Sequence, residues 1–325
     1  MKATAIAHPN IALIKYWGKL NRKLNLPANS SLALTIQPLH TITTVEFSNN
    51  FSDYIIETEF KDSYAISRII SHLELIKKVA LDKGLKVPKY AKVKSYNNFP
   101  MGTGLASSAS GYAALTEAAT SALGLNLTPK EKSIIASYGS GSASRSIFGG
   151  YVIRRRGESH SEQLVDENYF IINDFIVIVD RERKKIGSSK GMVLSRNSPL
   201  YKARLDASEK NFLKMRRAII EKDFDTMGSL AEEDCFLMHA IMITTKPPLL
   251  YWSPSTLKII KEVIKWREEG LRVYFTIDAG PNVHILCLPK DSNKVEKKLK
   301  ELEEVKEIIK AYPGSGSRLL EEHLF

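Results

Sequence analysis

The chain has 325 residues, 43% of them hydrophobic, with a net charge of +11 and a pI near 9.4. Such a length and composition can fill two modest hydrophobic cores, so two domains are expected. No apolar run approaches the ~20 residues that span a bilayer, and the Met1-Lys2 start does not lead into a signal peptide. We therefore expect a soluble cytoplasmic protein that has no membrane partner.

The positive charge is scattered along the chain and is not interleaved with aromatic residues on one stripe. This distribution argues against a nucleic-acid partner, and part of the charge could attract a polyanionic substrate. Cys235 and Cys287 have neither a disulfide-framework spacing nor a metal-ligand spacing, so buried thiols are expected. A single bridge between them is the alternative, and it would fit a hyperthermophilic source.

The first sixty residues are predicted to contain strands at 4–8, 41–47 and 53–58. Between the first two strands, Lys15 and Lys19 stand four residues apart beside Tyr16 and Trp17. One interpretation places the aromatic rings in the core and both lysines on the surface. The other interpretation makes this segment part of an anion site.

A glycine-rich turn follows a predicted helix at 67–83 and a predicted strand at 91–96. Gly102 and Gly104 let the backbone take positive φ and approach a ligand closely, and residues 109–123 have the composition of a helix. Free N–H groups at a helix start suit a phosphate. The spacing matches neither a Walker A loop nor a dinucleotide fingerprint, so an ordinary glycine turn is the alternative.

A capping box from Thr128 to Glu131 predicts a helix at 129–138, and a serine- and glycine-rich segment at 139–151 follows it. This segment contains one arginine, Arg145, whose guanidinium could clamp a carboxylate or phosphate through two parallel hydrogen bonds. A flexible loop with a surface arginine is the alternative. A strand is expected at 150–154.

The composition changes after the polar stretch 158–168, and the apolar strand 170–179 is predicted to open a second domain. A polar loop is expected at 184–192. The other predicted elements are helices at 200–221, 224–242, 255–269 and 293–304 and strands at 271–277 and 283–288. Asp278 lies where an apolar strand meets Gly280-Pro281, a position that suits either a catalytic carboxylate or a turn cap.

Five separated segments resemble the mevalonate diphosphate decarboxylases, a branch of the GHMP kinase superfamily, in the order found in that family. These segments are 10–19, Leu-Pro-x-Asn-Ser-Ser-Leu from Leu26, Gly-Leu-Ala-Ser-Ser from Gly104, Ser-Gly-Ser-Ala-Ser-Arg up to Arg145, and Asp-Ala-Gly-Pro-Asn from Asp278. Two features depart from the pattern of the eukaryotic members: the loop reads Pro-Met-Gly-Thr-Gly-Leu, as in kinases of the superfamily, and the chain is shorter.

The resemblance implies an α+β GHMP kinase fold with two domains. Residues 1–168 would form a ribosomal-protein-S5-like domain that binds ATP and substrate, and residues 169–325 a ferredoxin-like domain that carries Asp278. The implied reaction converts mevalonate 5-diphosphate and ATP into isopentenyl diphosphate, ADP, phosphate and carbon dioxide with Mg²⁺, in a homodimer. Phosphomevalonate decarboxylases and mevalonate 3-kinases share much of the pattern, so the substrate's phosphorylation state stays open.

Residue by residue, the resemblance places Asp278 at the C3 hydroxyl as a base and Arg145 on the substrate carboxylate. Lys15 or Lys19 would neutralise the transferring phosphoryl group, and Asn10 would add a neutral hydrogen bond. The implied catalytic set is Asp278, Arg145, Lys15 and Asn10. The implied substrate contacts are Tyr16, Trp17, Gly18, Lys19, Arg68, Ser140, Gly141, Ser142, Ala143, Ser144, Arg145 and Ser189. The implied ATP contacts are Gly102, Thr103, Gly104, Leu105, Ala106, Ser107 and Ser108.

The roles of Arg68 and His239 each have a structural alternative. Arg68 lies on a short helical stretch and could equally be a surface arginine. His239 matches a family histidine within a helix, and we interpret it as structural. No direct metal ligand is assigned.

Overall fold

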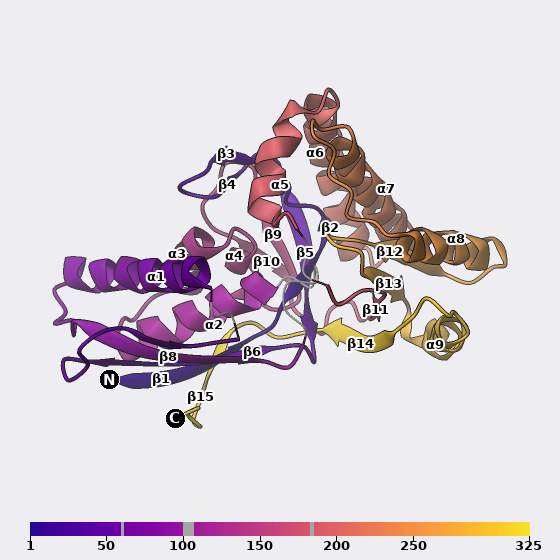
Figure 1. The fold of residues 1–325 in the computed structure, drawn as a ribbon. Coiled ribbons are helices and arrows are strands. Elements are labelled where there is room, and N and C mark those ends of the chain that lie inside the picture. Colours follow the sequence, from indigo (N-terminus) through magenta and orange to yellow (C-terminus); the bar gives the residue numbers. More distant parts are fainter. Residues whose placement is uncertain (60–61, 100–106, 183–184) are drawn as a thin grey trace.

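The structure is a computed structural model and describes residues 1–59, 62–99, 107–182 and 185–325. It contains two main sheets, and helices cover both (Figure 1). The first sheet has five strands in the order β15-β1-β6-β8-β7. These strands are β15 (Arg318–Leu320), β1 (Lys2–Ala7), β6 (Thr41–Ser48), β8 (Tyr90–Asn97) and β7 (Ile55–Glu57).

Helices pack on one face of this first sheet, because one side of each strand is apolar. Ala5, Val45 and Val93 lie in the same hydrophobic cluster as Leu73 and Ala118 from the helices. The helices of this half are α1 (Ser63–Asp82), α2 (Ser107–Ala122), α3 (Pro129–Gly139) and the short α4 (Ala143–Ser146). The capping box at Thr128 is present as predicted, with Pro129 at the first helical position.

The second sheet has eight strands and draws them from both halves of the sequence. Its order is β10-β9-β5-β14-β11-β13-β12, with β2 paired to β5. These strands are β10 (Glu162–Val165), β9 (Tyr151–Arg154), β5 (Ser31–Gln37), β14 (Glu307–Pro313), β11 (Asn173–Ile178), β13 (Val283–Cys287), β12 (Val273–Thr276) and β2 (Asn10–Ile14). A small separate hairpin joins β3 (Lys19–Asn21) to β4 (Leu26–Pro27).

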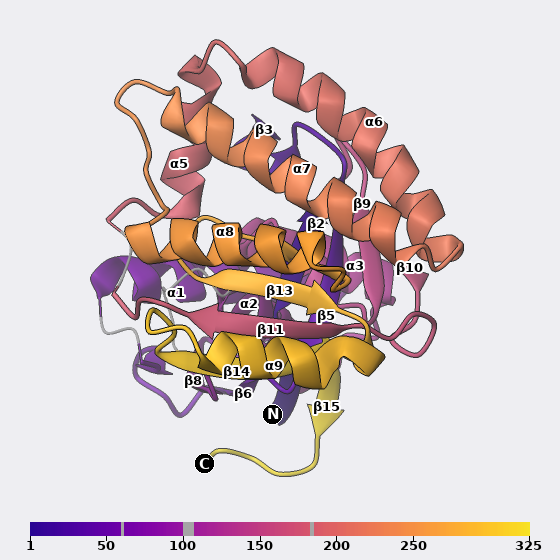
Figure 2. The ribbon, with the colours of Figure 1, turned by 90° about the vertical axis from the view of Figure 1, so that its right-hand side faces the viewer.

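Helices cover both faces of the C-terminal part of this sheet (Figure 2). Along β11, Ile176 faces the cluster that contains Phe212 of α6 (Tyr201–Ile220), and Val177 faces the cluster that contains Val263 of α8 (Pro254–Glu268). This alternation is the period of two that a strand buried on both faces requires. The helices are α5 (Ser188–Leu194), α6 (Tyr201–Ile220), α7 (Phe224–Ile243), α8 (Pro254–Glu268) and α9 (Ser292–Lys300), and the 3-10 turns are η1 (Ser195–Asn197) and η2 (Pro289–Asp291).

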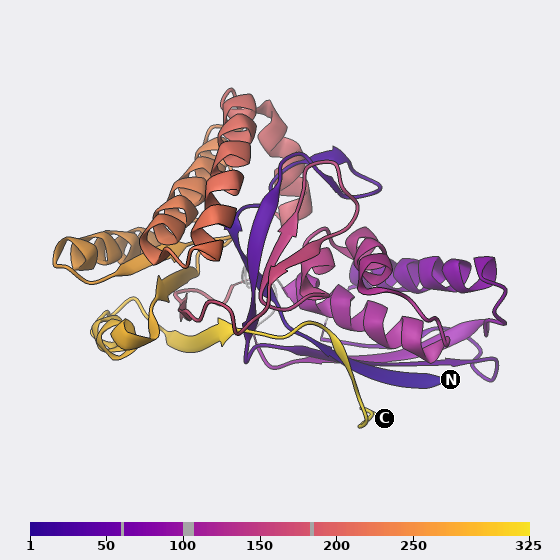
Figure 3. The same ribbon diagram turned by 180° about the vertical axis from the view of Figure 1, so that it is seen from behind.

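The C-terminal segment returns to the N-terminal half of the molecule (Figure 3). In β14, Tyr312 pairs with Gln37 of β5, and in β15 Leu319 pairs with Ala5 of β1. The two halves are therefore joined by strand pairing as well as by the chain. A division into domains at residue 168 remains a prediction.

Several predicted elements differ from the structure. The expected polar loop at 184–192 is wrong from Ser188 onward, because α5 begins there and buries Met192 beside Trp17. The prediction contains no counterpart of strands β2, β3, β4, β5, β10, β14 and β15, and β7 is three residues long where a strand at 53–58 is expected. Cys235 and Cys287 are free and buried, which excludes the bridge. Within the described ranges, no helix has the length and apolar composition that crossing a membrane requires.

Candidate active site

A cleft with a volume of about 860 Å³ is lined by residues from both halves of the sequence. Its described lining contains eight cationic side chains and one carboxylate, Asp278. The cations are Lys15, Lys19, Arg22, Lys23, Arg68, Arg145, Lys185 and Lys190. A cleft whose walls carry one sign of charge concentrates ligands of the opposite sign, so this cleft suits a polyanion.

At the cleft wall, Nζ of Lys15 donates to Oδ1 of Asp278 at 2.8 Å. The Lys15 side chain is 1% exposed and that of Asp278 is 26% exposed, so the carboxylate faces the cleft and the ammonium lies behind it. Burial alone would raise the pKa of Asp278. The charge and hydrogen bond of Lys15, together with smaller influences from His284 and Arg145, outweigh that effect, and the pKa of Asp278 lies below its usual range. Asp278 is therefore ionised at neutral pH.

The guanidinium of Arg145 is buried and oriented by two neighbours. Its Nε and Nη2 donate to Oδ1 of Asn10 at 3.1 and 3.0 Å, and its Nη1 donates to Ser31 Oγ at 3.1 Å. Burial lowers the pKa of Arg145 to about 10, so it stays a cation at neutral pH. The alternative of a surface arginine on a flexible loop is wrong, because the residue lies in α4 and is 3% exposed.

Asn10 lines the cleft, and both ends of its amide have protein partners. Its Oδ1 accepts the two bonds from Arg145, and its Nδ2 donates to Oγ of Ser146 at 2.7 Å and to the carbonyl of Ser142 at 3.2 Å. In this arrangement Asn10 orients Arg145.

Tyr16 lies between two arginines and against the loop that precedes α4. The guanidiniums of Arg145 and Arg154 stand 5.9 and 5.6 Å from its ring centre. Its hydroxyl donates to the carbonyl of Asn25, and burial raises the pKa of Tyr16 to about 12. A Cβ on Gly141 would come within 2.4 Å of the Tyr16 hydroxyl, so only glycine fits at that position.

Three predicted substrate contacts lie further along the cleft. Nζ of Lys19 is 3.3 Å from Oγ of Ser189, and Arg68 donates to the carbonyl of Gly139. Burial, followed by the positive charges of nearby arginines, chief among them Arg68, lowers the pKa of Lys19 to about 8. Arg68 is partly buried and is not a free surface arginine.

The start of α2 stands between the cleft and a second cavity of about 230 Å³. Ser107 and Ser108 line both, and Ser108 Oγ lies 3.2 Å from Oγ of Ser140. The second cavity also includes the apolar side chains Val93 and Leu115. The predicted phosphate contacts Gly102, Thr103, Gly104, Leu105 and Ala106 lie outside the described residues.

The structure brings most of the other predicted site residues to the cleft. Those that line it are Asn10, Lys15, Tyr16, Trp17, Lys19, Arg68, Ser140, Gly141, Ser142, Arg145, Ser189 and Asp278. Three other predicted contacts are not among the described residues that line the cleft: Ala143 and Ser144 are fully buried, and Gly18 packs against Tyr201 with φ of +125°. Trp17 donates its indole N–H to Ser195.

Sequence reasoning missed four cations of the cleft: Arg22, Lys23, Lys185 and Lys190. Their positions in the sequence could have indicated them. Arg22 and Lys23 follow Lys19, and Lys185 and Lys190 lie before and after Ser189.

His239 lies behind the cleft. Its Nε2 accepts the indole N–H of Trp252 at 3.1 Å, and burial lowers the pKa of His239 to about 3, so the ring is neutral. These contacts support a structural role.

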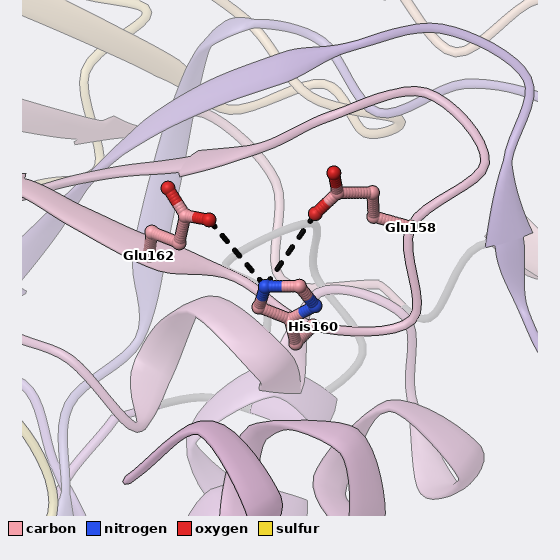
Figure 4. A group of neighbouring side chains, drawn as sticks. All are labelled: Glu158, His160 and Glu162. Atoms are coloured by element: carbon pink, nitrogen blue, oxygen red, sulfur yellow. Dashed lines mark ion pairs between the residues drawn. The ribbon is translucent and has the colours of Figure 1, made fainter.

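Glu158, His160 and Glu162 form the one group of three metal-ligand side chains found among the described residues (Figure 4). Nε2 of His160 lies 3.4 Å from an oxygen of each glutamate, and Arg155 pairs with that same Glu162 oxygen at 2.8 Å. The guanidinium already neutralises this carboxylate. None of the three residues lines the cleft.

Comparison with known proteins gives matches over both halves of the chain. Residues 7–165 match the family model for the diphosphomevalonate decarboxylase-like N-terminal domain, and residues 174–320 match that for the mevalonate 5-diphosphate decarboxylase C-terminal domain. The diphosphomevalonate decarboxylase of Danio rerio is 37% identical over 88% of this chain and 76% of its own length.

Solved structures agree with these matches. The mevalonate diphosphate decarboxylase of Enterococcus faecalis superposes with a TM-score of 0.88 at 37% identity, covering 99% of each chain. A complex of MDDEF with MVAPP, AMPPCP and magnesium gives a TM-score of 0.89 at 37% identity, again over 99% of each chain.

Proposed function

Since this chain belongs to the diphosphomevalonate decarboxylase family, we propose that its cleft carries out the ATP-dependent decarboxylation of mevalonate 5-diphosphate to isopentenyl diphosphate. The observation that carries the proposal is the ionised Asp278 paired with buried Lys15 in a cleft that also holds Arg145. The substrate is a tertiary alcohol with a carboxylate at one end and a diphosphate at the other. Such a molecule requires several cations and one base, and the cleft supplies both.

In the first step the C3 hydroxyl oxygen attacks the γ-phosphorus of ATP, a new O–P bond forms, and the bond to the β-phosphate oxygen breaks to release ADP. Asp278 accepts the hydroxyl proton, and the Lys15 ammonium beside it offsets charge that develops on the phosphoryl group. Fixed charges that face developing charge in this way supply much of the acceleration in phosphoryl transfer.

In the second step the C3–O bond breaks and phosphate leaves with the bonding electrons. The electrons of the bond between the carboxylate carbon and C2 then form the C2–C3 double bond, and carbon dioxide departs. Three of the five N–H groups of Arg145 are used by Asn10 and Ser31, which leaves one on each terminal nitrogen for the substrate carboxylate. This fork would hold the bond that must break in line with the leaving phosphate.

ATP would place its phosphates near the start of α2, where the hydroxyls of Ser107 and Ser108 join the helix N-terminus. The second cavity, which shares those two serines, would take the nucleoside. A magnesium ion would arrive with the ATP phosphates, since this ion is typically bound by phosphates, waters and one or two protein oxygens. It would neutralise phosphate charge, and the hydroxyls of Ser107 and Ser108 would offer it protein oxygens beside the phosphates.

The family resemblance also supports a homodimer in the cytoplasm and no nucleic-acid partner. These assignments can be tested by light scattering of the purified protein, by fractionation of the source cells, and by titration with RNA at several salt concentrations.

The test of the function is an incubation of the protein with ATP and Mg²⁺ and with mevalonate, its 5-phosphate or its 5-diphosphate in turn. We expect ADP, phosphate and carbon dioxide in equal amounts from the 5-diphosphate, because one phosphoryl transfer serves one decarboxylation. Products from the 5-phosphate alone would make the protein a phosphomevalonate decarboxylase. ADP without carbon dioxide would make it a 3-kinase.

A further inference from the structure

The peptide groups of Lys15 are held by a buried network of polar side chains. The Lys15 N–H donates to Oδ2 of Asp234 at 2.6 Å. Its carbonyl accepts from Nη2 of Arg204 at 3.0 Å and from Nδ2 of Asn29 at 2.9 Å. Ser208 donates to the other oxygen of Asp234 at 3.0 Å, so both oxygens of that carboxylate have partners.

This network joins parts of the chain that are far apart in sequence. Asp234 lies on α7 and Arg204 on α6, and Lys15 directly follows β2. Arg204 and Asp234 pair at 3.3 Å, and their side chains are 1% and 0% exposed. A buried ion pair adds little net stability, because the cost of removing both charges from water offsets their attraction.

The position of Lys15 suggests what the pair contributes. β2 ends at Ile14, so the peptide groups of Lys15 leave the strand ladder and need other partners. Neutral side chains could satisfy them. Instead, the Asp234 carboxylate accepts from the N–H of Lys15 and the Arg204 guanidinium donates to its carbonyl. The Lys15 side chain is 1% exposed, and its ammonium donates to Asp278 at 2.8 Å.

We propose that Asp234 and Arg204 are positioning residues, which fix the Lys15 ammonium against Asp278 for phosphoryl transfer. The inference rests on the proposed function, because that function gives Lys15 and Asp278 their roles. Both residues act through the Lys15 backbone, and neither lines the cleft. A displacement of ~1 Å at a reacting group can lower a rate by ~10²-fold, so a modest shift of Lys15 is enough to matter.

The ionisation of Asp278 reports this positioning independently of turnover. The groups that act electrostatically on its carboxylate are Lys15, His284 and Arg145, which lie after β2, on β13 and on α4, while Cys235 and His239 of α7 lie near it. Burial favours the protonated carboxyl, and Lys15 is the largest influence that opposes burial. Withdrawal of the ammonium therefore raises the pKa of Asp278.

The experiment compares Asp234→Asn and Arg204→Lys with a matched control, Glu232→Gln. Asp234→Asn is nearly isosteric but leaves Arg204 without its counter-charge. Arg204→Lys keeps the charge balance, so it remains folded more readily, but a single ammonium cannot reach all four acceptors of the guanidinium, which are the carbonyls of Lys15 and Trp17, Oδ1 of Asn29 and Oδ2 of Asp234. Glu232 lies on the same helix and pairs with Arg267 at 2.7 Å, yet it does not touch Lys15.

The kinetic readouts are kcat and the KM values for ATP and for mevalonate 5-diphosphate. Circular dichroism gives the folded fraction, and ¹³C NMR without substrate follows the titration of the Asp278 carboxyl. The carboxyl resonance that disappears in the Asp278→Asn variant is assigned to Asp278. We expect kcat at least ~10-fold lower, KM values within about threefold, and a higher Asp278 pKa in both variants, with wild-type values in the control. If Asp234→Asn does not fold, the kcat and the Asp278 pKa of Arg204→Lys decide whether the network positions Lys15.

An unchanged Asp278 titration, with kcat reduced only in proportion to the folded fraction, would show that the network is merely structural and overturn the inference. A wild-type protein that releases no carbon dioxide would instead overturn the proposed function. The titration comparison would still decide whether Asp234 and Arg204 position Lys15.

Discussion

At the scale of single residues, the cleft pairs each reactive group with a partner that sets its charge or direction. Lys15 keeps Asp278 ionised, and Asn10 fixes the plane of Arg145. These partners come from distant parts of the chain, so the same residue types on a flexible loop would not share this chemistry. The expected effects of substitution follow from what each partner loses.

Replacing Asp278 by Asn separates catalysis from turn capping. Asn keeps an oxygen that can accept from Lys15, but it cannot take the C3 hydroxyl proton. We expect kcat to fall by ~10²–10⁴-fold, the typical value of general-base catalysis. Ligand affinities, measured by calorimetry, should stay within a few fold, and the circular dichroism spectrum should not change. Normal turnover with both ligands bound would remove Asp278 from the catalytic role.

Replacing Arg145 by Lys keeps the charge but removes the planar fork. Lysine cannot hold Asn10 and Ser31 and also present two parallel donors to a carboxylate. Steady-state kinetics should show turnover at least ~10-fold lower, equivalent to ~1.4 kcal/mol. Arg217→Lys on the exposed side of α6 is the matched control. Equal activity of the two variants would contradict a role for the fork.

The low pKa of Lys19 predicts a pH dependence. Burial destabilises its charged form, so Lys19 carries its charge below about pH 8 and loses it above that value. The ratio kcat/KM for the 5-diphosphate should therefore fall above pH 8, about tenfold for each further pH unit. Lys19→Arg should move this limb to higher pH, while Lys298→Arg on α9 should not. A limb that stays in place in Lys19→Arg belongs to another group.

At the scale of elements, the C-terminal strands complete sheets that begin elsewhere. Residues 4–6 of β1 pair with residues 318–320 of β15, and the N–H of Leu324 donates to Thr44. The chain also crosses from β14 to this sheet through Gly314, whose carbonyl accepts from the N–H of Gly150 at 2.9 Å. Residues 318–325, here called the C-terminal strap, therefore extend the first, five-stranded sheet, and they do not line the cleft.

A variant shortened after Ser317 tests the strap. We expect the free energy of unfolding to fall by about 2–4 kcal/mol, at ~1 kcal/mol for each hydrogen bond lost. Because no residue beyond 317 lines the cleft, kcat/KM at low temperature should stay within about twofold. Urea unfolding and steady-state assays measure the two quantities. Lost activity in a fully folded variant would show that the strap also shapes the site.

At the scale of the whole molecule, the net charge of +11 is partly concentrated at one site. Eight of the described cleft residues are Lys or Arg, against one carboxylate. This local excess of positive charge favours the attraction of anionic ligands to the cleft.

This concentration of charge predicts a salt effect on binding. Between about 0.05 and 0.5 M KCl, added ions shorten the Debye length and screen the cleft. We expect the KM for mevalonate 5-diphosphate to rise at least about fivefold while kcat changes less than about twofold, as measured by initial rates. Potassium chloride and sodium chloride should act alike, since the effect is one of ionic strength. A KM independent of salt would mean that contacts other than charge dominate binding.

The sequence alone determined the features that depend on neighbours in the chain. Periodicity located α6, α7 and α8, the Thr128 capping box located α3, and the five motifs indicated the family and most of the cleft residues. Only the tertiary structure decided which lysine meets Asp278, that Asn10 serves Arg145, and that Asp234 and Arg204 grip Lys15. These are contacts between groups more than a hundred residues apart. The same reason explains why strands β5 and β14 were not predicted. Each is stabilised by pairing with a strand that is distant in the sequence, and the local sequence of one strand does not identify its partner.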